Sequence, residues 1–291
     1  HIASCMAENK LEEKVIGIAF DGTGYGEDHK IWGGEFILAD LLSYQRIGHL
    51  KYQPMPGGEQ AIHQPWRMVY SYLYSVFGQK ITQFNIGFIK RRSVKEIDLI
   101  SQMIEKKINS PLTSSCGRLF DAVASIIGIR DEVNFEGQAA VALESLCNPA
   151  YKGNYSYGID QAESGWLVNV EEMFREIVQD IEKNKNISGI ATRFHNTLAE
   201  FILSMCVRIR DKYYVNLVVL SGGVFQNSFL LNQTLKKLND NGFKVFIHKK
   251  MPPNDACIAL GQAVIANERS ADGYLILKGK TDHEMISHIV E

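Results

Sequence analysis

A short apolar run that leads into an acid and three glycines constrains this chain more than any other stretch. Residues 15–20 (VIGIAF) predict a buried strand, and residues 21–26 (DGTGYG) follow at once. Glycine lets backbone N–H groups approach a ligand closely, so Asp21 with Gly22 and Gly24 suits a phosphate or a metal-bound phosphate. A plain turn between two strands uses the same residue types, and both interpretations stay open here.

The rest of the apolar pattern predicts a strand meander, then helices, then strands that alternate with helices. This order indicates an α/β or α+β fold with a mixed sheet. Ser93 and Glu96 predict a capping box, and Pro65 predicts a kink or a second helical segment. The expected strands are 15–20, 31–38, 41–50, 165–168, 216–220 and 243–248. The expected helices are 2–10, 59–77, 93–107, 118–127, 139–146, 170–183, 187–210, 224–238 and 256–268. Residues 272–291 show no clear pattern.

A second strand runs into glycines at residues 220–227 (LSGGVFQN), far from the first in sequence. Gly222 and Gly223 free backbone N–H groups at a helix start, where an anion is favoured. Asn227 lies one turn further, within reach of a ribose or a base. Two such turns across a cleft would hold a nucleotide between two lobes. A tight turn packed on a helix would have the same sequence, and no P-loop motif is present.

Two further acidic residues occupy positions that suit either ligand binding or an ordinary role in a helix. Asp255 precedes the helix 256–268, either as its N-cap or as a carboxylate ligand of a metal shared with phosphate. Gly117 and Asp121 lie one helical turn apart. Asp121 there suits ribose hydroxyls, with room left at Gly117, although a solvated helix face is the alternative.

Composition bears on partners and location. The formal net charge is -2, so the chain shows no nucleic-acid footprint. No apolar run approaches the roughly 20 residues that span a bilayer, so no membrane contact is expected. The 5 cysteines are scattered, with no C-x-x-C pair, which favours a reducing cytosol and a cytoplasmic location over a disulfide framework.

Taken together, these stretches resemble the HypF family, the carbamoyltransferases of [NiFe]-hydrogenase maturation, over residues 1 to about 268. The tRNA threonylcarbamoyl-transferases and O-carbamoyltransferases are relatives of that family. The matching motifs are 21–26, 31–35 (IWGGE), 54–58 (PMPGG), 65–67 (PWR), 115–121 (SCGRLFD), 135–138 (FEGQ), 220–227 and 254–255 (ND).

The resemblance implies an α/β, two-lobed actin-like ATPase fold with a ribonuclease-H-like sheet in each lobe and a first lobe incomplete at its N-terminus. It assigns residues 1–112 to the first lobe, with 254–269 packing back on it, 113–253 to the second lobe, and 270–291 to an appendage. The family's acylphosphatase, zinc-finger and carbamoyl-adenylate-forming domains are expected to be missing. So is the first histidine of a His-x-x-x-His motif that ends at His1.

The resemblance also implies the chemistry. Carbamoyl phosphate and ATP give carbamoyl adenylate, and the carbamoyl group passes to the C-terminal cysteine of the partner HypE, so no covalent nucleophile is expected in this chain. An iron or zinc ion, with magnesium also considered, would take the metal ligands His1, Asp21 and Asp255. The nucleotide-binding residues would be Gly22, Gly24, Gly117, Asp121, Gly222, Gly223 and Asn227.

Three other functions fit the same residues. An O-carbamoyltransferase acting on a small molecule would share the fold and the metal. A sugar kinase or ATPase of the same superfamily would need a catalytic base for its hydroxyl acceptor. A non-enzymatic binding lobe is the third alternative.

Overall fold

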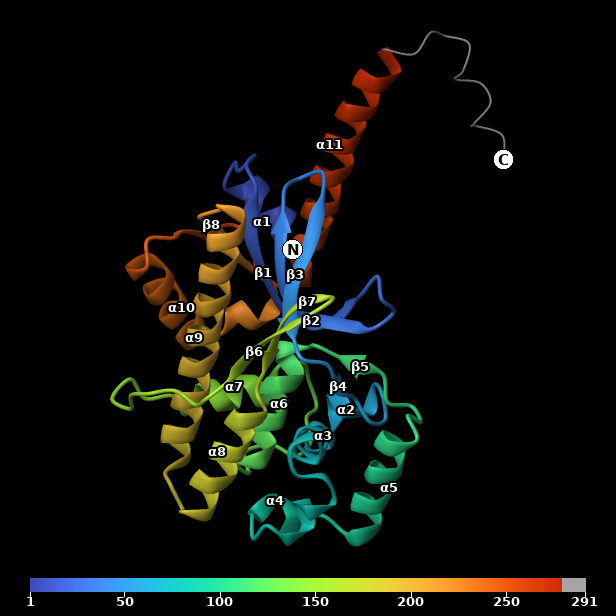
Figure 1. Ribbon diagram of the computed structural model, residues 1–291, viewed down its shortest axis with the longest axis vertical. Coiled ribbons are helices and arrows are strands. Elements are labelled where there is room, and N and C mark those ends of the chain that lie inside the picture. The colour runs from blue at the N-terminus through green and yellow to red at the C-terminus, as the bar shows by residue number, and fades with distance from the viewer. Residues whose placement is uncertain (279–291) are drawn as a thin grey trace.

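A mixed nine-stranded sheet runs through the computed structural model, which describes residues 1–278 (Figure 1). Seven strands follow the order β6-β7-β3-β2-β1-β8-β9, and the short strands β4 and β5 pair beside β2. The strands are β1 (Val15–Tyr25), β2 (Ile31–Ala39), β3 (Tyr44–Leu50), β4 (Gln53–Pro54), β5 (Leu112–Thr113), β6 (Gly158–Ala162), β7 (Gly165–Asn169), β8 (Leu217–Ser221) and β9 (Lys244–Phe246).

The helices lie largely where the apolar pattern predicts them. Pro65 divides the expected helix 59–77 in two, and the capping box of Ser93 and Glu96 is confirmed. The α-helices are α1 (Ile2–Glu8), α2 (Gln60–His63), α3 (Trp66–Phe77), α4 (Gly87–Lys90), α5 (Val94–Glu105), α6 (Cys116–Ile126), α7 (Gln138–Glu144), α8 (Glu171–Glu182), α9 (Ile187–Tyr213), α10 (Ser228–Asp240) and α11 (Ile258–Lys278). The 3₁₀ helices are η1 (Gly78–Gln83), η2 (Gly223–Gln226) and η3 (Asp255–Cys257).

The glycine-rich stretch 21–26 differs from its prediction as a turn. β1 continues through it to Tyr25, with a shift in register between Phe20 and Gly24, and Gly24 pairs with Trp32 of β2. Pairing with β2 satisfies the backbone groups there, so the chain stays extended. The strands β4, β5 and β6 were not predicted. Of the expected appendage, residues up to Lys278 continue α11, and residues 279–291 lie outside the described part.

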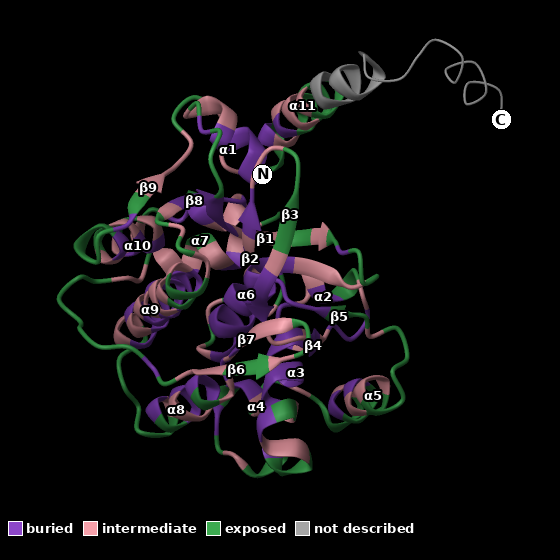
Figure 2. Ribbon diagram, turned by 45° about the horizontal axis from the view of Figure 1, so that its top comes forward, coloured by how far each residue is buried: buried purple, intermediate pink, exposed green. Residues whose placement is uncertain are grey.

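β1 is an interior strand of the sheet, between β2 and β8, and is covered on both faces. Ile16, Ile18 and Phe20 belong to the large apolar core, whereas Val15 belongs to a smaller core under α1. α1 packs closely on the second face, since a Cβ at Gly17 would lie 2.1 Å from Cδ1 of Ile2. The deepest helix is α6, which Figure 2 shows as mostly buried in the middle of the molecule.

The sheet joins strands that lie far apart in sequence. β1 pairs with β2 antiparallel, β2 pairs with β3 antiparallel, and β1 and β9 both pair with β8 in parallel. In Figure 1, α1 and α11 lie toward the top of the molecule, α10 lies beside the sheet, and α3, α4, α5 and α8 lie toward the bottom. The predicted α/β fold with a ribonuclease-H-like sheet is confirmed, but the described residues form one sheet, whereas the resemblance implies one sheet in each of two lobes. The domain boundary at residues 112 and 113 stays a prediction, and the sheet itself runs across it.

None of the described helices is long and apolar enough to cross a bilayer.

Candidate functional site

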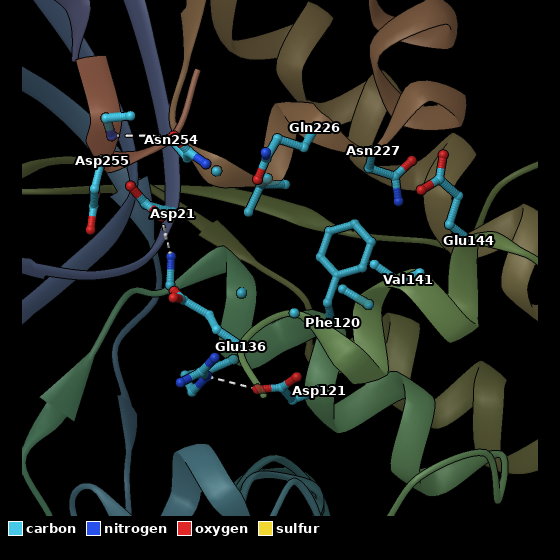
Figure 3. A pocket seen from close by; sticks show the side chains of 18 residues that line it. Asp21, Phe120, Asp121, Glu136, Val141, Glu144, Gln226, Asn227, Asn254 and Asp255 are labelled. Carbon is cyan, nitrogen blue, oxygen red and sulfur yellow. Dashed lines mark hydrogen bonds and ion pairs between the residues drawn. The ribbon is translucent and has the colours of Figure 1, made fainter. Parts of the chain in front are cut away.

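A cavity of about 460 Å³ lies where the shift in register of β1 and the end of β8 meet the starts of α6 and α7 (Figure 3). It joins segments from five parts of the chain, which no local sequence pattern could place together. Its wall consists of Asp21, Gly22, Gly117, Arg118, Phe120, Asp121, Glu136, Gly137, Ala140, Val141, Glu144, Gly223, Val224, Gln226, Asn227, Asn254, Asp255 and Ala256.

The three predicted metal ligands meet between this cavity and a second one of about 490 Å³: Asp21 and Asp255 line both cavities, whereas His1 lines only the second. Nε2 of His1 lies 2.8 Å from Oδ2 of Asp21 and 3.5 Å from Oδ1 of Asp255. One ligand atom from each residue lies within 4.8 Å of the other two. Asp255 reaches this place because the backbone N–H of Gly222 donates to the carbonyl of Pro253 at 2.9 Å, which ties the segment before η3 to the end of β8.

Charge and chemistry around these three residues suit a cation. Burial alone would lower the pKa of His1, but the hydrogen bond and the negative charge of Asp21 outweigh it and raise that pKa to about 9. His1 is therefore protonated at neutral pH and donates to Asp21 in the absence of metal. An imidazole nitrogen with two carboxylates is a ligand set that borderline cations such as iron and zinc accept, so the residues fit the predicted ion.

Gly222 and Gly223 allow two backbones to meet. Gly222 has φ +104°, and a Cβ there would lie 2.1 Å from the carbonyl oxygen of Phe20, so a side chain would force β8 away from β1. A Cβ at Gly223 would lie 3.1 Å from Oδ1 of Asp21. Gly223 thus lines the cavity beside Asp21, whereas Gly222 supports it from behind.

Gly117 has a packing role that the sequence analysis did not anticipate. A Cβ at Gly117 would lie 2.9 Å from Cα of Gly22, so the start of α6 rests directly on β1. Ser115 holds this contact, because its hydroxyl lies 3.0 Å from the carbonyl of Asp21 and 2.7 Å from that of Gly22. Gly22 and Gly117 both line the cavity. Gly24, opposite Trp32, lines the second cavity instead.

Asp121 faces the cavity from α6 with only 3% of its surface exposed, which rules out the solvated helix face. Its Oδ2 lies 2.8 Å from Nε of Arg118. Burial raises the pKa of Asp121 above its usual range, and Arg118 opposes that rise. The pair offers hydrogen-bonding groups to a polar ligand at the floor of the cavity.

Asn227 lies at the opposite end of the cavity from Asp21 (Figure 3). Its Oδ1 accepts from the backbone N–H of Leu230 at 2.8 Å and caps α10, and its Nδ2 lies 2.9 Å from Nε2 of His195. The structure therefore brings Gly22, Gly117, Asp121, Gly223 and Asn227 to the wall of one cavity, and their part in nucleotide binding stays a prediction.

Several residues of the cavity wall were not among the predicted site residues. Glu136, Gln226, Asn254 and Phe120 lie inside the motifs 135–138, 220–227, 254–255 and 115–121, so the motifs themselves contained the signal. Glu144 lies inside a predicted helix with no local signal at all.

Comparisons with known proteins agree on one family. The model described as "Carbamoyltransferase, Kae1-like Domain, second subdomain" matches residues 17–262. The chain is 38% identical to carbamoyltransferase HypF of Synechocystis sp. over 276 residues, which is 90% of this chain and 35% of that protein. It is 32% identical to the probable carbamoyltransferase HypF of Methanocaldococcus jannaschii over 267 residues, 91% of this chain and 34% of that one.

Solved structures give the same result. A crystal structure of full-length HypF in the phosphate- and nucleotide-bound form superposes with a TM-score of 0.86 at 46% identity, covering 92% of this chain and 41% of that one. HypF of T. kodakarensis gives a TM-score of 0.74 at 31% identity, covering 91% and 35%. The chain spans about a third of the length of the curated relatives it matches.

Proposed function

The chain belongs to the HypF family of carbamoyltransferases, and from this premise we propose that it performs the carbamoyl-transfer step on a carbamoyl adenylate. One observation carries the proposal. The candidate metal ligands Asp21 and Asp255 line the same cavity as Gly117, Asp121, Gly223 and Asn227. An ion at one end and polar groups along the floor suit a nucleotide whose reacting end lies beside the ion.

The cavity volume agrees with this ligand. Small-molecule and cofactor sites typically enclose about 300–1,000 Å³, and this cavity has about 460 Å³. The solved relative that is 46% identical is described as phosphate- and nucleotide-bound. In our proposal Asp121 with Arg118 faces the ribose, and Gly22 and Gly223 let the phosphate approach the strand ends.

His1, Asp21 and Asp255 would hold the ion. When bound, iron or zinc would supply positive charge beside the mixed anhydride. The nitrogen ligand favours these metals over magnesium, which prefers oxygen ligands. Behind the strands, Phe20 and Phe225 stack with ring centroids 5.7 Å apart and support the backbone that carries Asp21.

The acceptor sulfur comes from the partner, HypE in this proposal. Burial raises the pKa of Cys5 to about 12 and of Cys147 to about 12, and that of Cys116 well above its ordinary range, so these thiols stay protonated. The partner's cysteine thiolate attacks the carbamoyl carbon, a C–S bond forms, and the C–O bond to the adenylate phosphate breaks to release AMP. The carbamoyl phosphate and ATP from which the adenylate is made are consumed elsewhere in the protein.

Mass spectrometry of HypE tests the proposal. The intact natural protein is incubated with HypE, carbamoyl phosphate and ATP, and we expect a mass gain of one carbamoyl group on the C-terminal cysteine. Asp21→Asn weakens one of the three proposed ligands of the ion, and with the ion its positive charge beside the anhydride, so it should lower the rate by about two orders of magnitude. Asp240→Asn, an exposed change at the end of α10, is the matched control.

The same experiment separates the alternatives. Carbamoylation of a small hydroxyl compound with no modification of HypE would identify an O-carbamoyltransferase and refute the proposed acceptor. ATP hydrolysis or phosphoryl transfer without any carbamoyl product would refute the transfer reaction itself.

A further inference from the structure

A hydrogen-bond donor and an acceptor stand side by side at the end of the cavity that is remote from Asp21. Figure 3 shows Asn227 and Glu144 together there, with Phe120 and Val141 beside them. Glu144 ends α7, and its Oε1 accepts from the backbone N–H of Phe229 at 3.1 Å. Both polar residues therefore meet at the first turn of α10, and apolar side chains border them.

The orientation of the Asn227 amide follows from its neighbours. A backbone N–H only donates, so the amide atom that faces Leu230 N at 2.8 Å must be the oxygen. The other atom, which lies 2.9 Å from Nε2 of His195, is then the nitrogen. One N–H of Nδ2 is used by His195, and the second N–H is left for the cavity that Asn227 lines.

Nε2 of His195 can accept the hydrogen bond from Nδ2 of Asn227. Its Nδ1 lies 2.8 Å from the carbonyl of Ala191, which only accepts, so Nδ1 carries the proton and Nε2 keeps a lone pair. The ring is fully buried on α9, edge-on to Phe120, Phe194 and Phe229 at centroid distances of 5.2, 5.4 and 5.6 Å. Burial lowers the pKa of His195 to about 4, so the ring is neutral at physiological pH.

Glu144 supplies the complementary group. Its carboxylate only accepts, and among the residues that the structure describes Oε2 has no hydrogen-bond partner. We propose that Glu144 and Asn227 recognise the edge of an adenine base that carries the 6-amino group. Glu144 accepts a hydrogen bond from the exocyclic amine, and Nδ2 of Asn227 donates one to the adjacent ring nitrogen N1. His195 is the positioning residue for Asn227. The inference rests on the proposed function, which places an adenylate in this cavity.

The pair would reject a 6-oxo purine. Hypoxanthine presents a carbonyl oxygen where adenine has its amine, and a ring N–H where adenine has a lone pair. The oxygen would face the carboxylate of Glu144, and the ring N–H would face the N–H of Asn227. Each unsatisfied polar contact costs a factor of about 10 or more in affinity, so a preference for AMP over IMP on the order of 100-fold is expected.

Titration calorimetry of the full 291-residue chain with AMP and with IMP tests the inference. Glu144→Gln keeps an oxygen for Phe229 N and offers an N–H to the 6-oxo group, so the AMP preference should fall at least tenfold. Glu163→Gln, an exposed change between β6 and β7, is the matched control and should keep the parent preference. An unchanged preference in Glu144→Gln would overturn the role of Glu144.

Two substitutions separate positioning by His195 from a general effect on folding. His195→Leu frees the Asn227 amide, so the AMP-to-IMP ratio should fall about tenfold, whereas His195→Gln offers an acceptor oxygen and should restore it. The ratio does not depend on the folded fraction. Equal ratios in parent and His195→Leu would overturn the positioning role. If the parent binds neither nucleotide, the proposed function fails; if it binds both equally, only the base-reading inference fails.

Discussion

Individual side chains in this site hold the backbone and face the cavity at the same time. Asn227 caps α10 while its amide nitrogen lines the wall, and Asp21 accepts from the backbone N–H of Gly22 at 2.7 Å while it lies against His1. Because the same side chains hold the backbone and line the cavity, a substitution at these positions changes both the local fold and the geometry of the site. Matched control variants are needed for that reason.

Metal binding should compete with protons at His1. The pKa of His1 is about 9, raised by Asp21 against burial, so a metal must displace the Nε2 proton at pH 7. We expect the apparent zinc affinity of the full 291-residue chain to rise about tenfold per pH unit from pH 7 to 9 and to level off above, as measured by competition with a chelator.

A ligand deletion checks the same site. Asp255→Ala should weaken zinc binding by at least tenfold at pH 8, because it removes one of three ligands. Asp98→Ala, exposed on α5, should bind as the parent does. An unchanged zinc affinity in Asp255→Ala would show that Asp255 is not a metal ligand and is only the first residue of η3.

At the scale of elements, the site depends on the contact between α6 and β1. The N-cap of α6 is Ser115, whose hydroxyl accepts from the backbone N–H of Arg118 at 3.0 Å and faces the carbonyls of Asp21 and Gly22. Gly117 completes the contact by its lack of a side chain. The start of α6 is therefore bound to the part of β1 that carries the candidate metal ligand Asp21.

Ser115→Ala should cost more than the loss of an ordinary cap. We expect about 2 kcal/mol in the free energy of unfolding, measured by urea denaturation, because the cap and the bond to β1 are both lost. Ser93→Ala removes the exposed cap of α5 and should cost about 1 kcal/mol. Equal costs for the two variants would show that the bond from Ser115 to β1 contributes nothing to stability.

At the scale of the whole molecule, the sheet couples the two ends of the chain. β1 and β8 pair in parallel from Ile16 opposite Val218 to Ala19 opposite Ser221. Residues near the start of the chain therefore share a core with residues more than 200 positions later. Loss of either strand would disrupt the wall of the cavity that β1 and the end of β8 form.

Hydrogen exchange should show this coupling. We expect the amides of β1 and β8 to exchange with the same, highest opening free energy, because neither strand can separate without unfolding the sheet. α5 should exchange much faster, since it buries only Ile97 and Ile100 and leaves Val94 74% exposed. Exchange of β1 at a lower opening free energy than β8 would contradict the coupling.

Most elements could be predicted from the chain, and the errors have identifiable causes. Periodic helices such as α5 and α8 lie close to their predicted ranges because one apolar face specifies them. Residues 21–26 were wrongly predicted as a turn, because their glycines are compatible with both structures and pairing with β2 decided between them. The two-residue strands β4 and β5 depend on partners distant in sequence, so no local pattern could reveal them.

The sequence by itself determined the family and named most of the residues of the candidate site. The ordered motifs predicted the HypF resemblance, which the family match confirms, and they contained Asp21, Asp121, Asn227 and Asp255. Only the tertiary structure decided which of these residues share a wall and which atoms face it. It separated Gly24 from Gly22 and gave Gly117 a packing role. It also set Glu144 and His195 beside Asn227, because contacts between segments distant in sequence depend on how helices pack on the sheet.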